Sequence, residues 1–200
     1  QFLREKLKTD HLSSGDLFRF HLQQGTPLGT RVAEYMNQGL LVPDEVTIDI
    51  ILDKVLAFPE EGGFVLDGFP RTPDQAKALE QALQDKSRDL DKVLFINVPE
   101  AELVRRLSNR YVCRGCQAPY AVEANDPEAV RECERCGGEL YQRPDDRPEA
   151  VQQRISVFQQ ETAPVLDFYR AKGLLADVSG VGSVECVNRR ILEALDLDLD

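Results

Sequence analysis

A chain of 200 residues is long enough for one domain, or one domain with an insertion, and it can bury a substantial core. No apolar run approaches the roughly 20 residues that a membrane span needs, and no signal peptide opens the chain, so we expect a cytoplasmic protein without membrane partners. The net charge of −11 argues against nucleic-acid partners, which require a basic surface, but does not exclude a small anionic ligand.

Helices and strands alternate along the chain. The predicted helices, in chain order, lie at Phe2 to Leu7, from Ser13–Asp16 past Leu22, through Val32 to near Gly39, from Pro43 to Leu56, from Thr72 to about Gln84, from Pro99 through Leu107, from about Pro148 to Lys172, and from Ser183 to Leu195. The predicted strands are Gly63 to Asp67, Lys92 to Val98 and Leu174 to Val178. This alternation predicts an α/β fold with a parallel sheet.

The strand at Lys92 to Val98 has the clearest pattern of the three. Its residues form a continuous apolar run, which is typical of a parallel strand covered on both faces. We therefore expect it to be buried.

Four of the five cysteines fall in two CxxC pairs. Cys113 and Cys116 form the first pair, and Cys133 and Cys136 form the second after sixteen intervening residues. This spacing predicts a structural zinc site with four thiolates and no open coordination position. Cys186, the fifth, lies in a helical pattern and is expected to be a buried free thiol.

The segment from Tyr111 to about Leu140 differs from the rest of the chain. It has several glycines, both CxxC pairs and no long apolar periodicity, so it is too polar to bury a core of its own. A structural zinc contributes an apparent binding free energy of about 10–16 kcal/mol, which would replace that core. We expect a chelator to loosen this insertion before the rest of the chain.

Arginines are placed at positions suited to binding phosphate groups. Arg106 and Arg110 lie four residues apart, on one face of a helix, and Arg143 and Arg154 flank two aspartates after the cysteine segment. A guanidinium group binds phosphate through two donors and stays charged. A solvated surface face would explain any one of these arginines, so that alternative stays open.

Two glycine-containing segments are candidate ligand sites. Asp67-Gly68-Phe69-Pro70-Arg71 follows the carboxyl end of a predicted strand, where open α/β sheets bind their ligands. Gly68 would let the backbone approach a ligand, and Arg71 could bind a phosphate. Ser14-Gly15-Asp16 could bind an anion at a helix start. The alternative for the first segment is a simple strand–turn–helix junction, and the alternative for the second is ordinary helix capping.

Taken in order, these motifs resemble adenylate kinase along nearly the whole chain. The matching segments are Ser-Ser-Gly-Asp-Leu-Phe-Arg at 13–19, Gly-Leu-Leu-Val-Pro-Asp-Glu at 39–45, Asp-Gly-Phe-Pro-Arg at 67–71, Arg106-x3-Arg110, the cysteine-bearing lid, Arg143-x-Asp-Asp and Arg154. Such an ordered set is specific, although any single member is not.

The resemblance implies a fold, a reaction and an oligomeric state. The fold would be a P-loop kinase-like α/β core at 1–12, 43–108 and 147–200, with a helical monophosphate-binding segment at 13–42 and a zinc-bound lid at 109–146. The reaction would be ATP + AMP = 2 ADP, with Mg²⁺ accompanying ATP, in a monomer. Lid closure would expel water, so that the phosphate is transferred to AMP rather than to solvent.

The resemblance also implies roles for individual residues. Those matching the AMP site are Ser14, Arg19, Gly68, Arg71 and Gln75, with Leu40, Leu41 and Val42 lining the pocket. Those matching the arginines around the transferring phosphates are Arg106, Arg110, Arg143 and Arg154. Tyr120 and the Gly182 backbone match positions that hold the ATP nucleotide, and Asp67 matches the carboxylate that organises magnesium and its waters. The resemblance further suggests a cis bond at Phe69-Pro70.

One family motif is absent from these 200 residues. The phosphate loop GxxxxGK[ST] does not occur, and alignment of the other motifs would place it, with a central parallel strand, before Gln1. We expect the sequence to be truncated there, and we expect little kinase activity from the 200-residue polypeptide itself.

Three alternative functions remain open. A UMP/CMP kinase of the same fold is the nearest, although Gln75 matches the adenine-reading residue and the cysteine lid fits bacterial adenylate kinases better. A non-catalytic, zinc-dependent binding module for nucleic acid is the second, and the acidic charge weighs against it. A nucleotide-binding fragment without turnover is the third.

Overall fold

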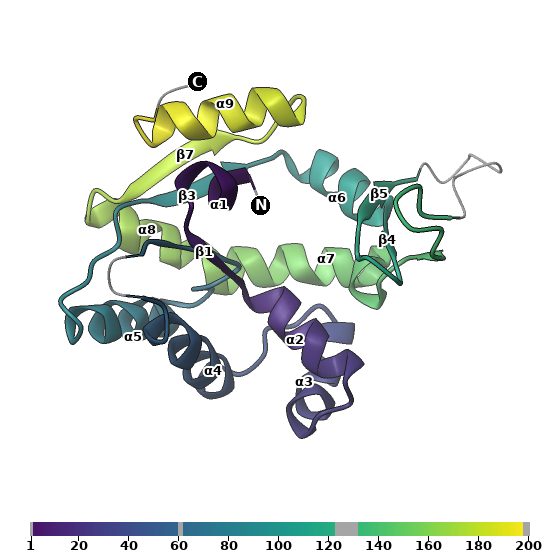
Figure 1. Ribbon diagram of the computed structural model, residues 1–200, viewed down its shortest axis with the longest axis horizontal. Coiled ribbons are helices and arrows are strands. Elements are labelled where there is room, and N and C mark those ends of the chain that lie inside the picture. Colours follow the sequence, from purple (N-terminus) through teal and green to yellow (C-terminus); the bar gives the residue numbers. More distant parts are fainter. Residues whose placement is uncertain (1, 60–61, 123–131, 198–200) are drawn as a thin grey trace. The chain divides into compact units, whose positions relative to one another are not determined.

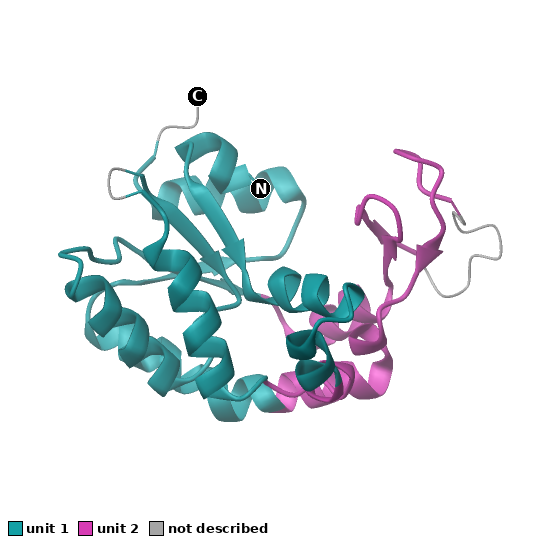
Figure 2. Ribbon diagram, turned by 60° about the horizontal axis from the view of Figure 1, so that its bottom comes forward, with its two compact units in different colours: residues 1–33, 42–97, 157–200 teal, residues 34–41, 98–156 magenta. Residues whose placement is uncertain are grey.

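The structure is a computed structural model, and it describes residues 2–59, 62–122 and 132–197 (Figure 1). The chain divides into two compact units (Figure 2). Unit 1 comprises residues 1–33, 42–97 and 157–200, and unit 2 comprises residues 34–41 and 98–156. The division predicted from the sequence, into a core, a 13–42 segment and a 109–146 lid, has different boundaries and stays a prediction.

The strands of unit 1 pair in parallel, as predicted. β1 (Asp10–Ser13) pairs with β2 (Phe64–Asp67), and β3 (Val93–Asn97) pairs with β7 (Leu175–Ser179). In the described part of the chain these are two separate two-stranded sheets. The sequence did not predict β1, because its four residues include only one large apolar side chain and therefore no apolar run.

The prediction that β3 is buried on both faces is wrong in this structure. Its first three residues are half-buried, its last two are exposed, and Ile96 has 46% of its surface accessible. β7 is its one hydrogen-bonded neighbour among the described strands, so its other edge has no strand against it there.

The helices of unit 1 begin and end close to the predicted residues. They are α1 (Phe2–Leu7), α2 (Ser14–Gln23), α4 (Asp44–Leu56), α5 (Pro73–Gln84), α8 (Ala163–Ala171) and α9 (Val184–Ala194), while α3 (Pro27–Asn37) runs from unit 1 into unit 2. The starts of three helices are fixed by hydroxyl N-caps, because Ser13, Thr72 and Ser183 each accept a hydrogen bond from an amide in the first turn. None of the described helices has the length and apolar character that crossing a membrane requires.

The core of unit 1 lies largely between α4 and α5, which pack side by side (Figure 1). Ile51 and Val55 of α4 meet Leu79 and Leu83 of α5, and all four are at most 1% exposed. Burying side chains of this size contributes about 1.5–3 kcal/mol each. These two helices therefore hold the residues at their N-terminal ends in fixed positions.

The helix predicted from Pro148 to Lys172 is interrupted in its middle. α7 (Pro148–Val157) is followed by a π-helical turn at Phe158–Thr162 and then by α8. Pro164 has no amide hydrogen to donate to the carbonyl four residues earlier, and its ring crowds that carbonyl, so the turn before it widens.

Besides the end of α3, the described part of unit 2 combines two helices with a small antiparallel sheet. α6 (Glu100–Ser108) leads into β4 (Arg110–Cys113), which pairs with β5 (Pro119–Ala121) on one side and β6 (Leu140–Tyr141) on the other. A 3₁₀ turn at Pro144–Asp146 then precedes α7. The described core of the sheet is small and consists of Cys113, Ala118 and Cys133.

Candidate functional site

The four paired cysteines of unit 2 converge as the sequence predicted. Their sulfur atoms all lie within 4.8 Å of one another, and none forms a disulfide. The Sγ atoms of Cys113 and Cys136 are 3.4 Å apart, as are those of Cys116 and Cys133. Zinc–sulfur bonds of about 2.3 Å in a tetrahedron require sulfur separations of about 3.8 Å, so this donor set fits one metal ion.

Backbone groups shape the cysteine cluster. The amides of Gly115 and Cys116 donate to Cys113 Sγ over 3.3 and 3.4 Å, which favours a negatively charged sulfur. Gly138 approaches the same atom so closely that a Cβ there would lie 2.8 Å from it. The sequence analysis did not single out Gly138, although a glycine two residues after a CxxC pair is a usable signal for such a close approach.

Tyr120 contacts the cysteine cluster through its hydroxyl. That hydroxyl donates to Cys133 Sγ over 3.3 Å and accepts from the Glu134 amide over 3.0 Å. Donation from Tyr120 lowers the pKa of the Cys133 thiol to about 6, which favours the thiolate that a metal binds. The role of Tyr120 in holding the ATP nucleotide stays a prediction.

A buried carboxylate holds two of the candidate phosphate-binding arginines. Asp146 is 0% exposed, and it accepts from Arg110 Nε over 2.8 Å and from Arg154 Nη1 over 3.2 Å. Arg154 also donates to the backbone carbonyl of Asp145 over 3.0 Å. Two arginines that are far apart in the sequence are therefore fixed beside one another within unit 2.

The other two candidate phosphate-binding arginines, Arg106 and Arg143, lie in different surroundings. Arg106 donates to Glu102 over 2.7 Å, and Arg105 binds the same carboxylate. Hydrogen bonds from Arg105 and then Arg106 lower the pKa of Glu102 to about 2. Arg143 is half-buried and directly precedes the 3₁₀ turn.

The register of β1 with β2 brings three predicted residues of unit 1 together. Ser13 lies opposite Asp67, so the residues that follow them, Ser14 and Gly68, are neighbours. Ser14 Oγ donates to the Gly68 carbonyl over 2.7 Å, and Arg71 Nε donates to the same oxygen over 2.8 Å. Gly68 has a φ of +73°, and a Cβ there would lie within 2.9 Å of both partner side chains, so this position requires glycine.

Asp67 and Arg19 are two further predicted residues of unit 1. Asp67 is the exposed last residue of β2, directly before Gly68. Arg19, in the second turn of α2, donates to Asp16 over 2.6 Å. The bond between Phe69 and Pro70 is cis, as the resemblance suggested.

Gln75 is almost fully buried, and both ends of its amide are bonded. Its Oε1 accepts from the Arg71 amide over 2.8 Å, and its Nε2 donates to Asp44 over 2.7 Å. Thr72 also donates to Asp44, over 2.6 Å. The sequence analysis gave Asp44 no role beyond opening α4, because no local pattern shows that it meets residues some 30 positions later.

The remaining predicted residues are placed in different parts of the chain. Val42, in unit 1, is buried, and its carbonyl accepts from the Thr47 hydroxyl over 3.2 Å. Leu40 and Leu41, in unit 2, are half-buried. Gly182, after β7, has a φ of +111°, which favours glycine. Cys186 is a half-buried free thiol rather than a fully buried one.

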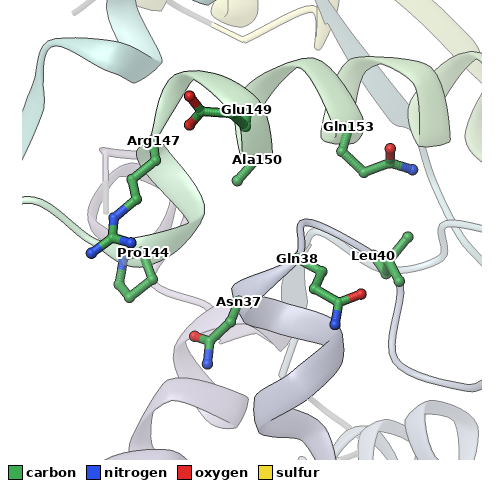
Figure 3. Close-up of a pocket in the computed structure, with 8 residues that line it drawn as sticks. All are labelled: Asn37, Gln38, Leu40, Pro144, Arg147, Glu149, Ala150 and Gln153. Carbon is green, nitrogen blue, oxygen red and sulfur yellow. The ribbon is translucent and has the colours of Figure 1, made fainter.

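Unit 2 also contains an open cavity of about 770 Å³ (Figure 3). The side chains of Asn37, Gln38, Arg147, Glu149 and Gln153 give it a polar lining, with Leu40, Pro144 and Ala150 completing the wall. Leu40 is the one sequence-predicted residue among them, so this cavity does not collect the predicted phosphate-binding arginines.

The fold has parallel strands, and candidate ligand-binding residues follow the carboxyl end of β2. Asp146 holds two arginines, and four cysteines form a cluster. Together these features define an α/β protein suited to phosphate-bearing ligands. Comparison with known proteins identifies the family within this class. The sequence model of the family described as adenylate kinase matches residues 1–174.

Curated relatives agree with this match. Proteins named adenylate kinase from Dehalococcoides mccartyi, Streptomyces griseus and Symbiobacterium thermophilum are 45%, 46% and 47% identical to the chain. The alignments cover 98%, 97% and 92% of this chain and 90%, 89% and 86% of the respective relatives. The chain belongs to the adenylate kinase family. The reaction of this family is the phosphotransfer ATP + AMP = 2 ADP, so the chain belongs to a phosphotransferase enzyme.

Proposed function

We propose that unit 1 binds the AMP phosphate and base in this reaction. The contact of Ser14 and Arg71 with the single carbonyl of Gly68 supports this most directly, because it places a hydroxyl and a guanidinium beside a glycine at the carboxyl end of a parallel strand. Arg71 and Arg19 would bind the phosphate, and Gln75 would contact the base. Val42, in the same unit, would line the pocket.

The arginines of unit 2 would bind the phosphate groups that are transferred. Arg110 and Arg154 are fixed side by side by Asp146, and a fixed pair can stabilise developing negative charge without reorganising. Arg106 and Arg143 would complete this set. Tyr120 and Gly182 would contact the ATP nucleotide, and Asp67 would organise the magnesium ion that accompanies ATP and its water molecules.

The cysteine cluster would hold a structural zinc ion. Support comes from four sulfurs within 4.8 Å of one another, with two amides and the Tyr120 hydroxyl donating to them. All four ligand positions are filled by protein thiols, so the metal would stabilise the small sheet and take no part in the reaction.

Three further expectations of the sequence analysis are part of this proposal. These are the monomeric state, the cytoplasmic location, and the division into a core, a 13–42 segment and a 109–146 lid. Sedimentation of the purified chain and fractionation of cells test the first two. Limited proteolysis with and without nucleotides tests the third.

Binding measurements test the assignment of unit 1. Calorimetric titration with AMP, UMP and CMP should give the tightest binding for AMP, and Arg71→Ala should weaken it by about 100-fold, as expected for a lost charge-assisted hydrogen bond. Arg170→Ala is the matched control, since Arg170 is an exposed arginine of the same unit bonded to Asp167. Tighter binding of UMP or CMP would point to the related pyrimidine kinases, and equal effects of the two variants would remove Arg71 from the site.

A further inference from the structure

One carboxylate joins the starts of two helices in unit 1. Asp44 is the first residue of α4, Thr72 is the N-cap of α5, and Gln75 lies in the first turn of α5. Asp44 Oδ2 accepts from the Thr72 hydroxyl over 2.6 Å, and Asp44 Oδ1 accepts from Gln75 Nε2 over 2.7 Å. The apolar packing of α4 on α5 keeps these helix starts together.

This arrangement fixes which way the Gln75 amide points. A carboxylate can only accept, so the NH₂ group must face Asp44, and the Arg71 amide can only donate, so Oε1 must face Arg71. Rotating the amide by half a turn would place Oε1 against the Asp44 carboxylate oxygen and the NH₂ group against the Arg71 N–H. Gln75 is only 2% exposed, so water cannot readily compensate for either mismatch.

The fixed amide keeps some hydrogen-bonding capacity. An amide group has two N–H donors and two acceptor lone pairs, and the described partners use one of each. One donor and one acceptor therefore remain, at positions set by Asp44 and Arg71. A base that touches Gln75 meets this fixed pattern.

Purines differ in the pattern they offer to such a group. A glutamine amide pairs with adenine by donating to a ring nitrogen and accepting from the 6-amino group. A 6-oxopurine carries an acceptor oxygen where adenine carries that amino group. An amide free to rotate could suit either base, whereas an amide locked in one orientation suits one of them.

We propose that Asp44 is a positioning residue that makes the site select a 6-aminopurine monophosphate over a 6-oxopurine monophosphate. It does so by locking the orientation of the Gln75 amide. This inference rests on the proposed function, in which Gln75 contacts the base of AMP.

A purely structural role for the same residues makes a different prediction. Thr72 and Gln75 occupy the N-cap and third positions of α5, where a glutamine side chain often reaches back to an amide near the cap. If Asp44 only strengthened this cap, its loss would change the stability of unit 1 and would weaken all monophosphates alike. The ratio of affinities therefore separates the two roles.

The test is the ratio of AMP affinity to inosine monophosphate affinity in Asp44→Asn. Asparagine keeps the shape of the side chain, and its NH₂ group can donate to the oxygen of a rotated Gln75 amide. Rotation then meets one mismatch, at the Arg71 amide, instead of two. We expect the preference for AMP to fall by about 10-fold, the effect of one misplaced hydrogen bond in a buried site. Asp74→Asn is the matched control, because it makes the same charge change in the first turn of α5, and the described partner of Asp74 is the exposed Lys77.

A second pair of variants covers the case in which Asp44→Asn does not fold. Thr72→Val removes the donor to Asp44 Oδ2, whereas Thr72→Ser keeps it, so only the valine variant should lower the preference for AMP. An unchanged affinity ratio in Asp44→Asn, or in Thr72→Val if the first variant is unfolded, overturns the role of Asp44 while AMP binding by the unaltered chain stands. An unaltered chain that binds neither monophosphate overturns the proposed function, and the role of Asp44 with it.

Discussion

The candidate monophosphate site of unit 1 and the cysteine module of unit 2 are ordered by different means. The first stands on α4 and α5, whose facing side chains are fully buried, and its polar groups are fixed by hydrogen bonds to caps and to Asp44. The second is a three-stranded sheet whose buried cluster consists of two cysteines and one alanine. A region with an apolar core can position polar groups by itself, whereas we expect a region with so small a core to depend on the proposed metal ion.

Removing the metal should break the second region and spare the first. In Cys133→Ser, or with a chelator, we expect β4 to β6 to lose the about 10 kcal/mol or more that a structural zinc contributes. Hydrogen exchange read by mass spectrometry should rise in β4 and remain slow in α4 and α5. Cys186→Ser is the matched control, since Cys186 lies outside the cluster. Slow exchange of β4 without metal would show that the sheet is stable unaided.

The next largest loss of stability is expected when the buried carboxylate of Asp146 in unit 2 is neutralised. Asp146→Asn leaves Arg110 and Arg154 without their shared charge, and breaking a buried pair in this way costs about 3–5 kcal/mol. Urea unfolding followed by a probe on α7 measures the loss. Asp167→Asn, which breaks an exposed pair with Arg170, should cost less than about 1 kcal/mol. Equal losses in the two variants would mean that Asp146 does not hold the arginines.

A glycine substitution tests how closely unit 1 is packed around its ligand residues. Gly68→Ala would place a methyl group 2.8 Å from Arg71 Nη2 in a backbone with positive φ, which we expect to cost about 2–3 kcal/mol and to weaken AMP binding. Gly173→Ala has the same sign of φ but open space around it, so only the backbone strain of about 1 kcal/mol should appear. Thermal unfolding and AMP titration of both variants separate strain from contact. Equal losses of stability and of AMP affinity in the two variants would show that the contact with Arg71 is unimportant.

The smallest effect concerns a buried hydroxyl beneath α5. Tyr169 is 1% exposed, its hydroxyl has no hydrogen-bond partner in the described part of the chain, and burial raises its pKa to about 12. Folding therefore favours the neutral phenol of Tyr169. Its contribution to the free energy of unfolding is fully present below pH 10 and decreases as the pH rises from 10 toward 12.

Tyr169→Phe should remove this alkaline loss and change the free energy of unfolding at pH 7 by no more than about 1 kcal/mol. Denaturant unfolding at pH 7 and pH 11 measures both values. A variant that loses stability between these two pH values as steeply as the unaltered chain would assign the alkaline sensitivity to another group.

Local chemistry in the sequence was sufficient for most of the secondary structure and for the metal site. Apolar periodicity and hydroxyl caps predicted the helices, and the CxxC spacing predicted that four sulfurs would converge. β1 was missed because a four-residue strand with one large apolar side chain has no periodic signal. The π-helical turn was missed because a proline inside a long apolar pattern shows where a helix is disturbed but not how the backbone adjusts.

The sequence by itself determined the elements, the cysteine cluster and the ordered motifs that identify the family. Only the tertiary structure decided which side chains bond to which: Asp44 with Gln75, Asp146 with Arg110 and Arg154, and Ser14 and Arg71 with the Gly68 carbonyl. The physical reason is that a cap or a metal knuckle is formed by residues within one turn. Three of these bonds join residues from about 30 to more than 50 positions apart, namely Asp44 with Gln75, Asp146 with Arg110 and Ser14 with the Gly68 carbonyl. The other two, Arg154 with Asp146 and Arg71 with the Gly68 carbonyl, join residues 8 and 3 positions apart and depend on how the backbone turns between them. Such contacts depend on the packing of helices and the register of strands, which no local pattern encodes.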